Sequence, residues 1–388
     1  MWKGCGLEPA PHATLRTRGN AMSKLAMRRA WFQVHKWIGL VLAILIIPLS
    51  LSGAALVWHD ALDRIVDPAR YAVSGRTVIG PDSYVAAARA ALKHGERIAT
   101  LTMPDDGGPV VVAASSASAP TRPGPPQRTM VYLDPPTARV LEVSPSNGGL
   151  VRFLHVLHGS LQLPGVGRSI VGWIGVAMMV SCFTGLWLWW PTVGKWTRGF
   201  RFRRHRDVET NLHHLFGFWI ALPLFVLSLT GAWISFPQVF GKLIGETSRP
   251  RGGPDRGAMM RAKPLASPAQ PLAVAIGKAR GIVDNAPLRS ITWPTDLSAD
   301  WTVTFQGGGA PIGVKVADDT GGATAAPARP QGGVARWMRR IHDGTDMGAL
   351  WQVIIFLGGI LPAVLAVTGV IMWWRARKWK AELAARRA

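Results

Sequence analysis

Two histidines of this sequence share one spacing to a motif of small residues. His35 lies 17 residues before Ser52 in the run LSLSG, and His213 lies 17 residues before Thr230 in the run LSLTG. An ionisable side chain in or beside an apolar segment costs solvation energy, so it indicates a function by default. Imidazole is also the commonest metal ligand among side chains. The repeated spacing predicts that both histidines hold the same position in two copies of one unit.

Two further histidines repeat in the same way. His158 lies 26 residues before Thr184, His342 lies 26 residues before Thr368, and a Trp pair follows each threonine by five and six residues. Self-similarity of this kind is the signature of an internal repeat. We therefore interpret the chain as two tandem copies of a unit that runs histidine, span, outer domain, histidine, span.

The repeat predicts how the four histidines face one another. Because each unit crosses a membrane twice, the copies have the same orientation and are related by an axis along the membrane normal. His35 should then face His213 near one membrane surface, and His158 should face His342 near the other. Zinc would need three or four protein ligands, and no Cys, Asp or Glu accompanies either pair. Haem needs only two axial ligands, so the pattern predicts two non-covalent b-type haems; the chain has no C-x-x-C-H motif for covalent attachment.

Neighbouring side chains leave alternatives open. His155 lies one helical turn from His158 and could exchange roles with it, and His214 follows His213. The repeat favours His158 and His213, because only they have a histidine at the matching position of the other copy. Four arginines near the outer pair could bind haem propionates or an anionic substrate, or could only extend to the membrane surface. They are Arg168, Arg336, Arg339 and Arg340.

Four apolar stretches must position these residues. They are uncharged, at least 22 residues long, and run Trp37–Trp58, Ser169–Trp190, Leu215–Phe236 and Ala349–Trp374. About 20 helical residues span a bilayer, so the sequence predicts an α-helical membrane protein with four transmembrane helices. The first stretch is too long for a cleaved signal peptide and ends in Trp58 rather than in small residues, so we expect it to be retained.

Each stretch also contains a Ser-Gly or Thr-Gly pair, at 52–53, 184–185, 230–231 and 368–369. Small residues let a neighbouring helix come close, and they would equally admit a flat macrocycle. The Trp pairs fit interfacial residues better than electron relays.

The charges predict the orientation. The net charge is +22, and 19 of the 44 Lys and Arg residues lie in the segments 1–36, 192–211 and 375–388, which flank the spans. The two long segments between spans, 59–168 and 237–348, are nearly balanced. The positive-inside rule therefore places both termini in the cytoplasm and both long segments outside, in a bacterial inner membrane. This distribution explains the basic excess without nucleic-acid binding. Translation could start at Met1, Met22 or Met27.

The two outer segments are predicted to fold as small α+β domains. The first should contain a helix at 81–93 and strands at 97–103, 109–113 and 129–143, the last folded at 134–136. The second should repeat this order, with a helix at 271–280 and strands at 288–293, 301–305 and 312–316. Neither segment has an evident nucleophile–base pair, so we expect no catalytic residues beyond the haem relay.

Four sequence blocks in this order resemble a known family, the PepSY-associated transmembrane proteins, over residues 29–378. The blocks are HKWIGL…LSLSGAALVW, LHGSLQLPGVGRSIVGW…TGLWLWWP, LHHLFGFW…LSLTGAW and IHDG…VTGVIMWW. The resemblance implies an iron-regulated inner-membrane protein with two PepSY domains outside. Members include ferric-siderophore reductases that hold two b-type haems in a four-helix bundle. PepSY domains elsewhere are similar to peptidase-inhibitor modules, which keeps a binding role open.

On this basis the chain divides into nine segments. They are a cytoplasmic tail (1–30), TM1 (31–58), a first periplasmic PepSY-like domain (59–157), TM2 with a preceding haem-binding segment (158–191), a basic cytoplasmic loop (192–211), TM3 (212–236), a second periplasmic PepSY-like domain (237–341), TM4 with a preceding haem-binding segment (342–374) and a basic cytoplasmic tail (375–388).

The leading hypothesis is an oxidoreductase in the lipid bilayer that passes electrons to a periplasmic ferric siderophore and releases Fe(II). The chain has no G-x-G-x-x-G motif after a strand, so the electron donor is expected to be a quinol or a separate reductase. The alternatives are a permease for a siderophore or other solute, and a non-enzymatic sensor or peptidase-binding protein. If residues 158–184 formed one continuous helix, Thr184 would lie about 39 Å from His158. We therefore expect the outer haem at or above the outer membrane surface. Pro164 should interrupt the helix between them.

Overall fold

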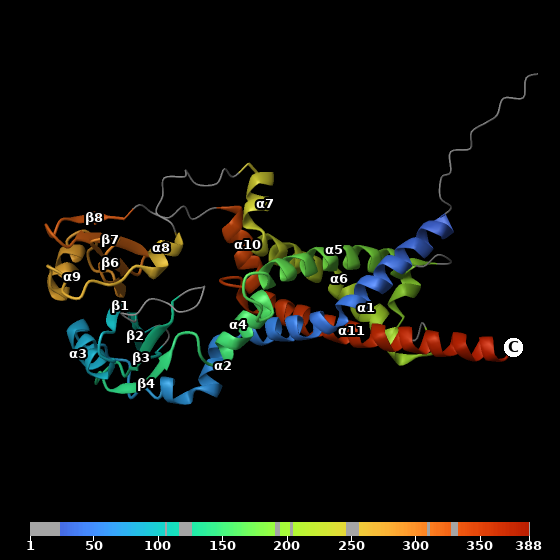
Figure 1. The fold of residues 1–388 in the computed structure, drawn as a ribbon, viewed down its shortest axis with the longest axis horizontal. Helices are drawn as coiled ribbons and strands as arrows, with labels where there is room; N and C mark the ends of the chain where they lie inside the picture. Colours follow the sequence, from blue (N-terminus) through green and yellow to red (C-terminus); the bar gives the residue numbers. More distant parts are fainter. Residues whose placement is uncertain are drawn as a thin grey trace, which may run out of the picture.

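Four long apolar helices form one bundle (Figure 1). They are α1 (Lys24–Leu56), α5 (Gly167–Trp189), α6 (Val208–Ser235) and α11 (Gly348–Ala385). The computed structural model describes residues 24–104, 107–115, 126–190, 195–201, 205–245, 256–308, 311–326 and 333–387. Each long helix is apolar and long enough to cross a membrane, which confirms the four predicted transmembrane helices.

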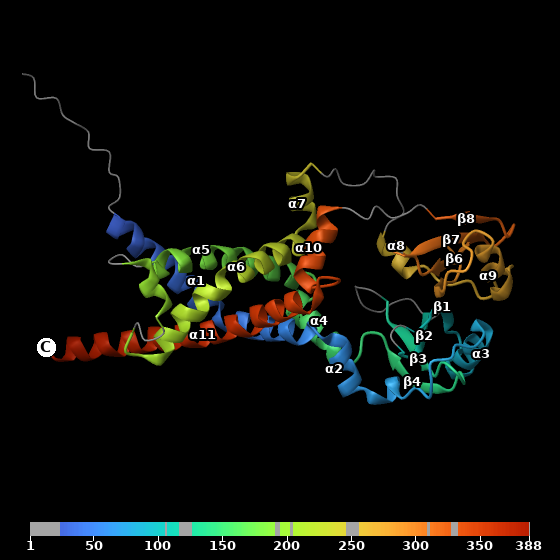
Figure 2. The ribbon, with the colours of Figure 1, turned by 180° about the vertical axis from the view of Figure 1, so that it is seen from behind.

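The two ends of the bundle differ. At one end α1 begins, and α11 extends beyond the other helices (Figure 2); we call this the terminal end. At the opposite end a β-sheet lies beyond the bundle, and we call this the sheet end. Within the bundle, α1 contacts α5 and α11, and α6 contacts the same two helices.

Two short helices cover the sheet end of the bundle. Helix α4 (Leu150–Ser160) packs against α1 and leads into α5, and α10 (Val334–Asp343) packs against α6 and leads into α11. The chain turns between α4 and α5 at Leu161 and Gln162, which have φ of 52° and 59°. Pro164 follows in the same turn, which confirms the predicted interruption of the helix.

Both segments outside the bundle contribute to one antiparallel sheet, in the order β4-β3-β2-β1-β5-β6-β7-β8. The first segment supplies α3 (Pro81–Ala91), β1 (Arg97–Thr102), β2 (Val110–Ser115), β3 (Arg128–Leu133) and β4 (Val140–Pro145). The second supplies α9 (Leu272–Arg280), β5 (Leu288–Thr292), β6 (Asp300–Phe305), β7 (Ile312–Ala317) and β8 (Ala323–Ala325). The predicted helices and strands are present with ends within two residues, and β8 was not predicted.

The two halves of the sheet are joined by a strand pair that the sequence analysis did not anticipate. Strands β1 and β5 run antiparallel with Leu101 opposite Ile291, and buried side chains from both halves form one hydrophobic cluster. Helices α3 and α9 cover the face of the sheet that points away from the bundle (Figure 1). Unpaired, β1 and β5 would each expose a row of backbone hydrogen-bonding groups. Their pairing makes one continuous unit where two separate small domains were expected.

Short elements complete the described part of the chain. They are α2 (His59–Val66), the 3₁₀ turns η1 (Pro68–Tyr71) and η2 (Trp196–Phe200), α7 (Pro237–Leu243) and α8 (Arg256–Arg261).

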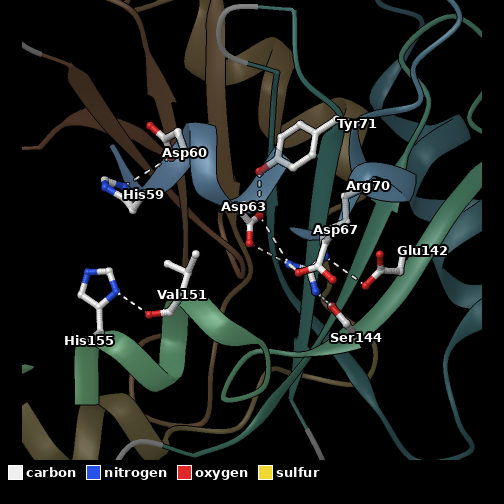
Figure 3. Close-up of polar contacts among 10 residues, drawn as sticks. All are labelled: His59, Asp60, Asp63, Asp67, Arg70, Tyr71, Glu142, Ser144, Val151 and His155. Atoms are coloured by element: carbon white, nitrogen blue, oxygen red, sulfur yellow. Dashed lines mark hydrogen bonds and ion pairs between the residues drawn. The ribbon is translucent and has the colours of Figure 1, made fainter. Parts of the chain in front are cut away.

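A buried arginine fastens the sheet to the bundle (Figure 3). Arg70 is 8% exposed and pairs with Asp63 at 3.1 Å, with Asp67 at 2.9 Å and with Glu142 on β4 at 3.0 Å. Tyr71 donates a hydrogen bond to Asp63, and burial together with this carboxylate raises the pKa of the Tyr71 hydroxyl. A buried charge is tolerated only when it is paired. The cluster therefore fixes α2, which follows α1 directly, to an edge strand of the sheet.

Candidate functional site

At the terminal end, one histidine from α1 lies opposite one from α6. The ring centroids of His35 and His213 are 6.3 Å apart, with 85° between the ring planes. His35 Nδ1 lies 3.1 Å from the carbonyl oxygen of Ser181 and 3.0 Å from Thr184 Oγ1. His213 Nδ1 lies 3.0 Å from Thr368 Oγ1. The structure thus brings together the first predicted pair, and each ring is held by the next long helix of its own half.

At the sheet end, the histidines of the two short helices form the second pair. The ring centroids of His158 on α4 and His342 on α10 are 6.0 Å apart, with 37° between the ring planes. His158 Nδ1 lies 2.8 Å from the carbonyl oxygen of Leu49. His342 Nδ1 lies 3.1 Å from the carbonyl oxygen of Leu227 and 3.0 Å from Thr230 Oγ1. The second predicted pair is therefore also present.

The hydrogen bonds define which ring nitrogen can bind a ligand. A carbonyl oxygen only accepts, so Nδ1 of His35, His158 and His342 must carry the proton. Thr368 Oγ1 donates to the carbonyl oxygen of Val364 at 2.8 Å, so it accepts from His213 in the same way. All four rings then present an unprotonated Nε2. A second hydrogen bond that fixes the tautomer is typical of metal-binding histidine.

The glycine of each Ser-Gly or Thr-Gly pair lies directly against one of these rings, and we call these four glycines the glycine seats. A Cβ added at Gly53 would lie 2.6 Å from Cε1 of His158, and one at Gly185 would lie 3.1 Å from Cε1 of His35. At Gly231 and Gly369 the corresponding distances to the rings of His342 and His213 are 3.1 and 3.4 Å. From the sequence, these pairs are expected to admit a macrocycle or a neighbouring helix. In the structure they admit imidazole rings from another helix.

The spacing of the rings fits a metal ion between them. A metal–imidazole bond is about 2.0–2.1 Å, and the ring centroid lies about 1.1 Å beyond the bonded nitrogen, so opposed ligands place their centroids about 6.3 Å apart. Both pairs are within about 0.3 Å of this value. Each pair offers two nitrogen donors, and the described residues contain no group of three or more His, Cys, Asp or Glu side chains that could hold a metal ion. The donor set fits haem, which brings its four other nitrogens.

A cavity of about 930 Å³ surrounds the pair at the terminal end and is lined by both His35 and His213. Its walls come from all four long helices and are mostly apolar. Cations that were not among the predicted site residues line it toward the terminal end, namely Arg28, Arg29, Arg377 and Lys380. Arg28 and Arg29 lie two helical turns before His35, which was the available signal. The volume is within the usual range for ligand sites, and the cations suit carboxylate groups such as propionates.

The Trp pairs divide between the cavity and the surface. Trp189 and Trp373 line the cavity, and Trp189 stacks on Phe218 with centroids 4.2 Å apart. Trp190 and Trp374 are 56% and 64% exposed. The predicted position at the membrane interface thus fits only the second tryptophan of each pair, Trp190 and Trp374.

The pair at the sheet end lies deeper than expected. His158 packs against Leu49 and Gly53, which precede the end of α1 at Leu56 by one to two turns. The second pair therefore lies beside the last turns of α1 rather than beyond its end, because α4 folds back along α1 instead of standing above it. His35 and Gly53 are 18 residues apart on α1, so the two pairs are separated by about 27 Å along the bundle.

The alternative histidines are directed elsewhere. His155 faces His59 on α2, with ring centroids 5.9 Å apart, and its Nδ1 bonds the carbonyl oxygen of Val151 (Figure 3). His214 lies against His205, with ring centroids 4.7 Å apart. His155 is thus not opposite His342, and His214 is not opposite His35.

The four predicted arginines differ in their surroundings. Arg168 donates to the carbonyl oxygen of Ile234, and Arg340 donates to the carbonyl oxygens of Thr345 and Asp346. Both therefore hold helix ends together. Arg336 and Arg339 are exposed on α10.

Fold and site together define a multi-pass α-helical membrane protein with two histidine pairs inside its bundle. The family model for the PepSY-associated TM region matches residues 32–376, and the chain belongs to this family. The resemblance seen in the sequence is confirmed. No curated protein sequence matches the chain.

Proposed function

We propose that this protein is a di-haem oxidoreductase of the bacterial inner membrane that passes electrons to a periplasmic ferric siderophore and so releases Fe(II). His35 and His213 would hold one b-type haem, and His158 and His342 the other. The bound haems would supply one-electron carriers whose potentials depend on their axial ligands and surroundings. The terminal end would face the cytoplasm, in accord with its cations, and the sheet would lie in the periplasm.

Hydrogen bonds and close packing from the chain's own residues would fix the orientation of the four ligands. Each Nδ1–H donates to an oxygen of a neighbouring helix, which prevents ring rotation and makes Nε2 more basic. The glycine seats hold each ring at van der Waals distance, so a ligand geometry exists before any cofactor binds. The walls of the cavity around His35 and His213 are mostly apolar.

The net reaction is a one-electron reduction of chelated Fe(III) to Fe(II). A quinol or a separate reductase supplies the electron. Fe(II) is bound less strongly by the hard, anionic oxygen donors of a siderophore, so the iron dissociates while the siderophore remains intact. Two sites about 27 Å apart along the bundle suit transfer from one membrane surface toward the other.

One observation carries this proposal. Two histidine pairs at different depths of one bundle have nearly equal centroid separations, 6.3 and 6.0 Å, and every ring is oriented through Nδ1. A permease or a peptidase-binding protein would not need two such matched pairs.

The test measures Fe(II) release, trapped by an Fe(II) chelator, together with the visible spectrum. We expect His158→Ala and His342→Ala to abolish release from a ferric siderophore while the haem at His35 and His213 is still reduced by the donor. His94→Ala, at an exposed position outside the bundle, is the matched control and should behave as wild type. If His342→Ala loses its haem and still releases Fe(II) at the wild-type rate, the proposal is wrong and the permease or binding functions are favoured.

A further inference from the structure

Two histidines outside the proposed haem sites lie against each other at the sheet end. His59 is the first residue of α2, His155 lies on α4, and their ring centroids are 5.9 Å apart. Figure 3 shows the two rings beside each other, apart from the contacts of Arg70. Both side chains are exposed, so a solute can reach them. His155 precedes His158 by three residues, about 4.5 Å along α4, so the His59–His155 couple is adjacent to the second pair.

Both rings of the couple are oriented through Nδ1, as the four proposed haem ligands are. His59 Nδ1 lies 3.1 Å from the carbonyl oxygen of Leu56. His155 Nδ1 lies 3.0 Å from the carbonyl oxygen of Val151. A carbonyl oxygen only accepts, so in each neutral ring Nδ1 carries the proton and Nε2 carries a lone pair. A hydrogen bond that fixes the ring in this way is typical of metal-binding histidine.

A carboxylate faces one of these lone pairs. Asp60 Oδ1 lies 3.3 Å from His59 Nε2, and two acceptors at this distance repel each other unless a cation, either a proton or a metal ion, lies with them. The neighbouring cluster pairs Arg70 with three carboxylates, so it holds an excess of negative charge that also favours a cation. Arg152, one turn before His155 on α4, opposes this field, but it is exposed and its charge is screened by water and salt.

The spacing of the two rings admits a metal ion. An ion bonded at about 2.0–2.1 Å to a ring nitrogen lies about 3.1–3.2 Å from the centroid of that ring, so two ligands of one ion have centroids at most about 6.3 Å apart. The value of 5.9 Å is just below this limit and corresponds to a bent arrangement. A ring contact alone could have the same spacing; the carboxylate at Nε2 is the independent observation that points to an ion. The couple supplies two donors, Asp60 is 84% exposed and can turn toward the ion, and water completes the shell.

We propose that His59 and His155 bind a divalent transition-metal ion at the sheet end and receive the Fe(II) that a reduced siderophore releases. Binding of the ion follows from the geometry, whereas its identity as Fe(II) rests on the proposed function. Imidazole suits Fe(II), Ni(II), Cu(II) and Zn(II), and the hard, anionic oxygens of a siderophore hold Fe(III). The couple therefore takes up iron only after the electron has been transferred.

Binding can be tested apart from electron transfer, with Ni(II) as the probe. Ni(II) binds nitrogen ligands more strongly than Fe(II) does, and it needs no siderophore. The experiment is calorimetric titration of the full-length, haem-loaded protein without a histidine tag. We expect His59→Ala and His155→Ala each to weaken Ni(II) binding by at least about tenfold, the lower bound for losing even a hydrogen-bond partner of a metal ligand. Fe(II) without oxygen should show the same dependence at lower affinity.

A matched control removes a histidine elsewhere. His94→Ala changes an exposed residue of the first outer segment and should leave Ni(II) binding unchanged. Wild-type affinity in both His59→Ala and His155→Ala would overturn the inference, because the two rings would then make an aromatic contact only. An equal loss in His94→Ala would overturn it as well, since binding would be unspecific.

The haem content separates this site from a second role for His155. Both variants of the couple should keep two haems with unchanged reduced α-bands. If His155→Ala loses the haem of the sheet end, His155 is a haem ligand and the inference is wrong. If Ni(II) and Fe(II) bind as expected and the ferric siderophore is never reduced, the proposed function fails and the metal site stands.

Discussion

The glycine seats allow a graded prediction. A Cβ at Gly53 would lie 2.6 Å from Cε1 and 2.9 Å from Nδ1 of His158, so the ring must move by about 0.8 Å to reach the 3.4 Å of ordinary contact. Overpacking of this kind costs about 1–3 kcal/mol, and displacement also weakens the 2.8 Å hydrogen bond to Leu49, worth about 1 kcal/mol. We expect Gly53→Ala to weaken haem binding at the sheet end by about tenfold to several hundredfold, at about 1.4 kcal/mol for each factor of ten.

The same substitution at other glycines supplies the series and its control. At Gly369 the added Cβ would lie 3.4 Å from the ring of His213, so Gly369→Ala should change haem affinity by less than about threefold. At Gly277, in α9 outside the bundle, an added Cβ would meet no atom within 4 Å, so Gly277→Ala should behave as wild type.

The assay is titration of the apoprotein with haemin, with the two sites resolved by their reduced α-bands. If Gly53→Ala binds haem as tightly as Gly277→Ala does, the ring of His158 does not lie against Gly53 when haem is bound. The geometric argument for the pair at the sheet end would then be refuted.

Three further predictions follow from the same contacts. His35→Ala or His213→Ala should remove the haem of the terminal end and leave the other, and equal loss of both α-bands in folded protein would contradict independent sites. Thr230→Val removes one of two acceptors for Nδ1–H of His342 and should weaken haem binding at the sheet end about 10–100-fold; an unchanged haemin titration would contradict this role. Asp134 is buried, yet hydrogen bonds from Ser74 and Thr137 outweigh burial and lower its pKa. The ionised carboxylate therefore stabilises the sheet at pH values above about 3.9, the pKa of this group in the unfolded chain. That stability is lost as the pH falls through the lower folded value. Asp134→Asn should therefore speed hydrogen exchange in strands β1–β4 at pH 7, with a difference from wild type that closes in acid; a difference that persists below the folded pKa would contradict the assignment.

The histidine pairs could be predicted from the sequence because equal spacings between matching residues can be recognised without a structure. Equal spacings of His35 and His213 to a small pair, and of His158 and His342 to another, predict which residues meet, because matching positions of a tandem repeat face each other across its symmetry axis.

Other features depended on contacts between distant segments. The 26 residues from His158 to Thr184 suggest a site above the bundle if the chain continues upward, and only the left-handed turn at Leu161 and Gln162 returns α4 along α1. The β1–β5 pair joins residues about 190 positions apart, and neither strand carries a local signal for the other. The contacts of Gly53 and Gly185 with histidine rings could not be predicted either. A small residue in a transmembrane helix indicates that another group comes close, but the sequence does not show which group it is.

The most direct test of the central claim is the haem stoichiometry of the purified, fully loaded protein by the pyridine-haemochrome assay. The account predicts two non-covalent haems per chain, extractable by acidic organic solvent, with low-spin spectra typical of bis-histidine ligation. A fully loaded protein with one haem, or a folded protein with none, would contradict it.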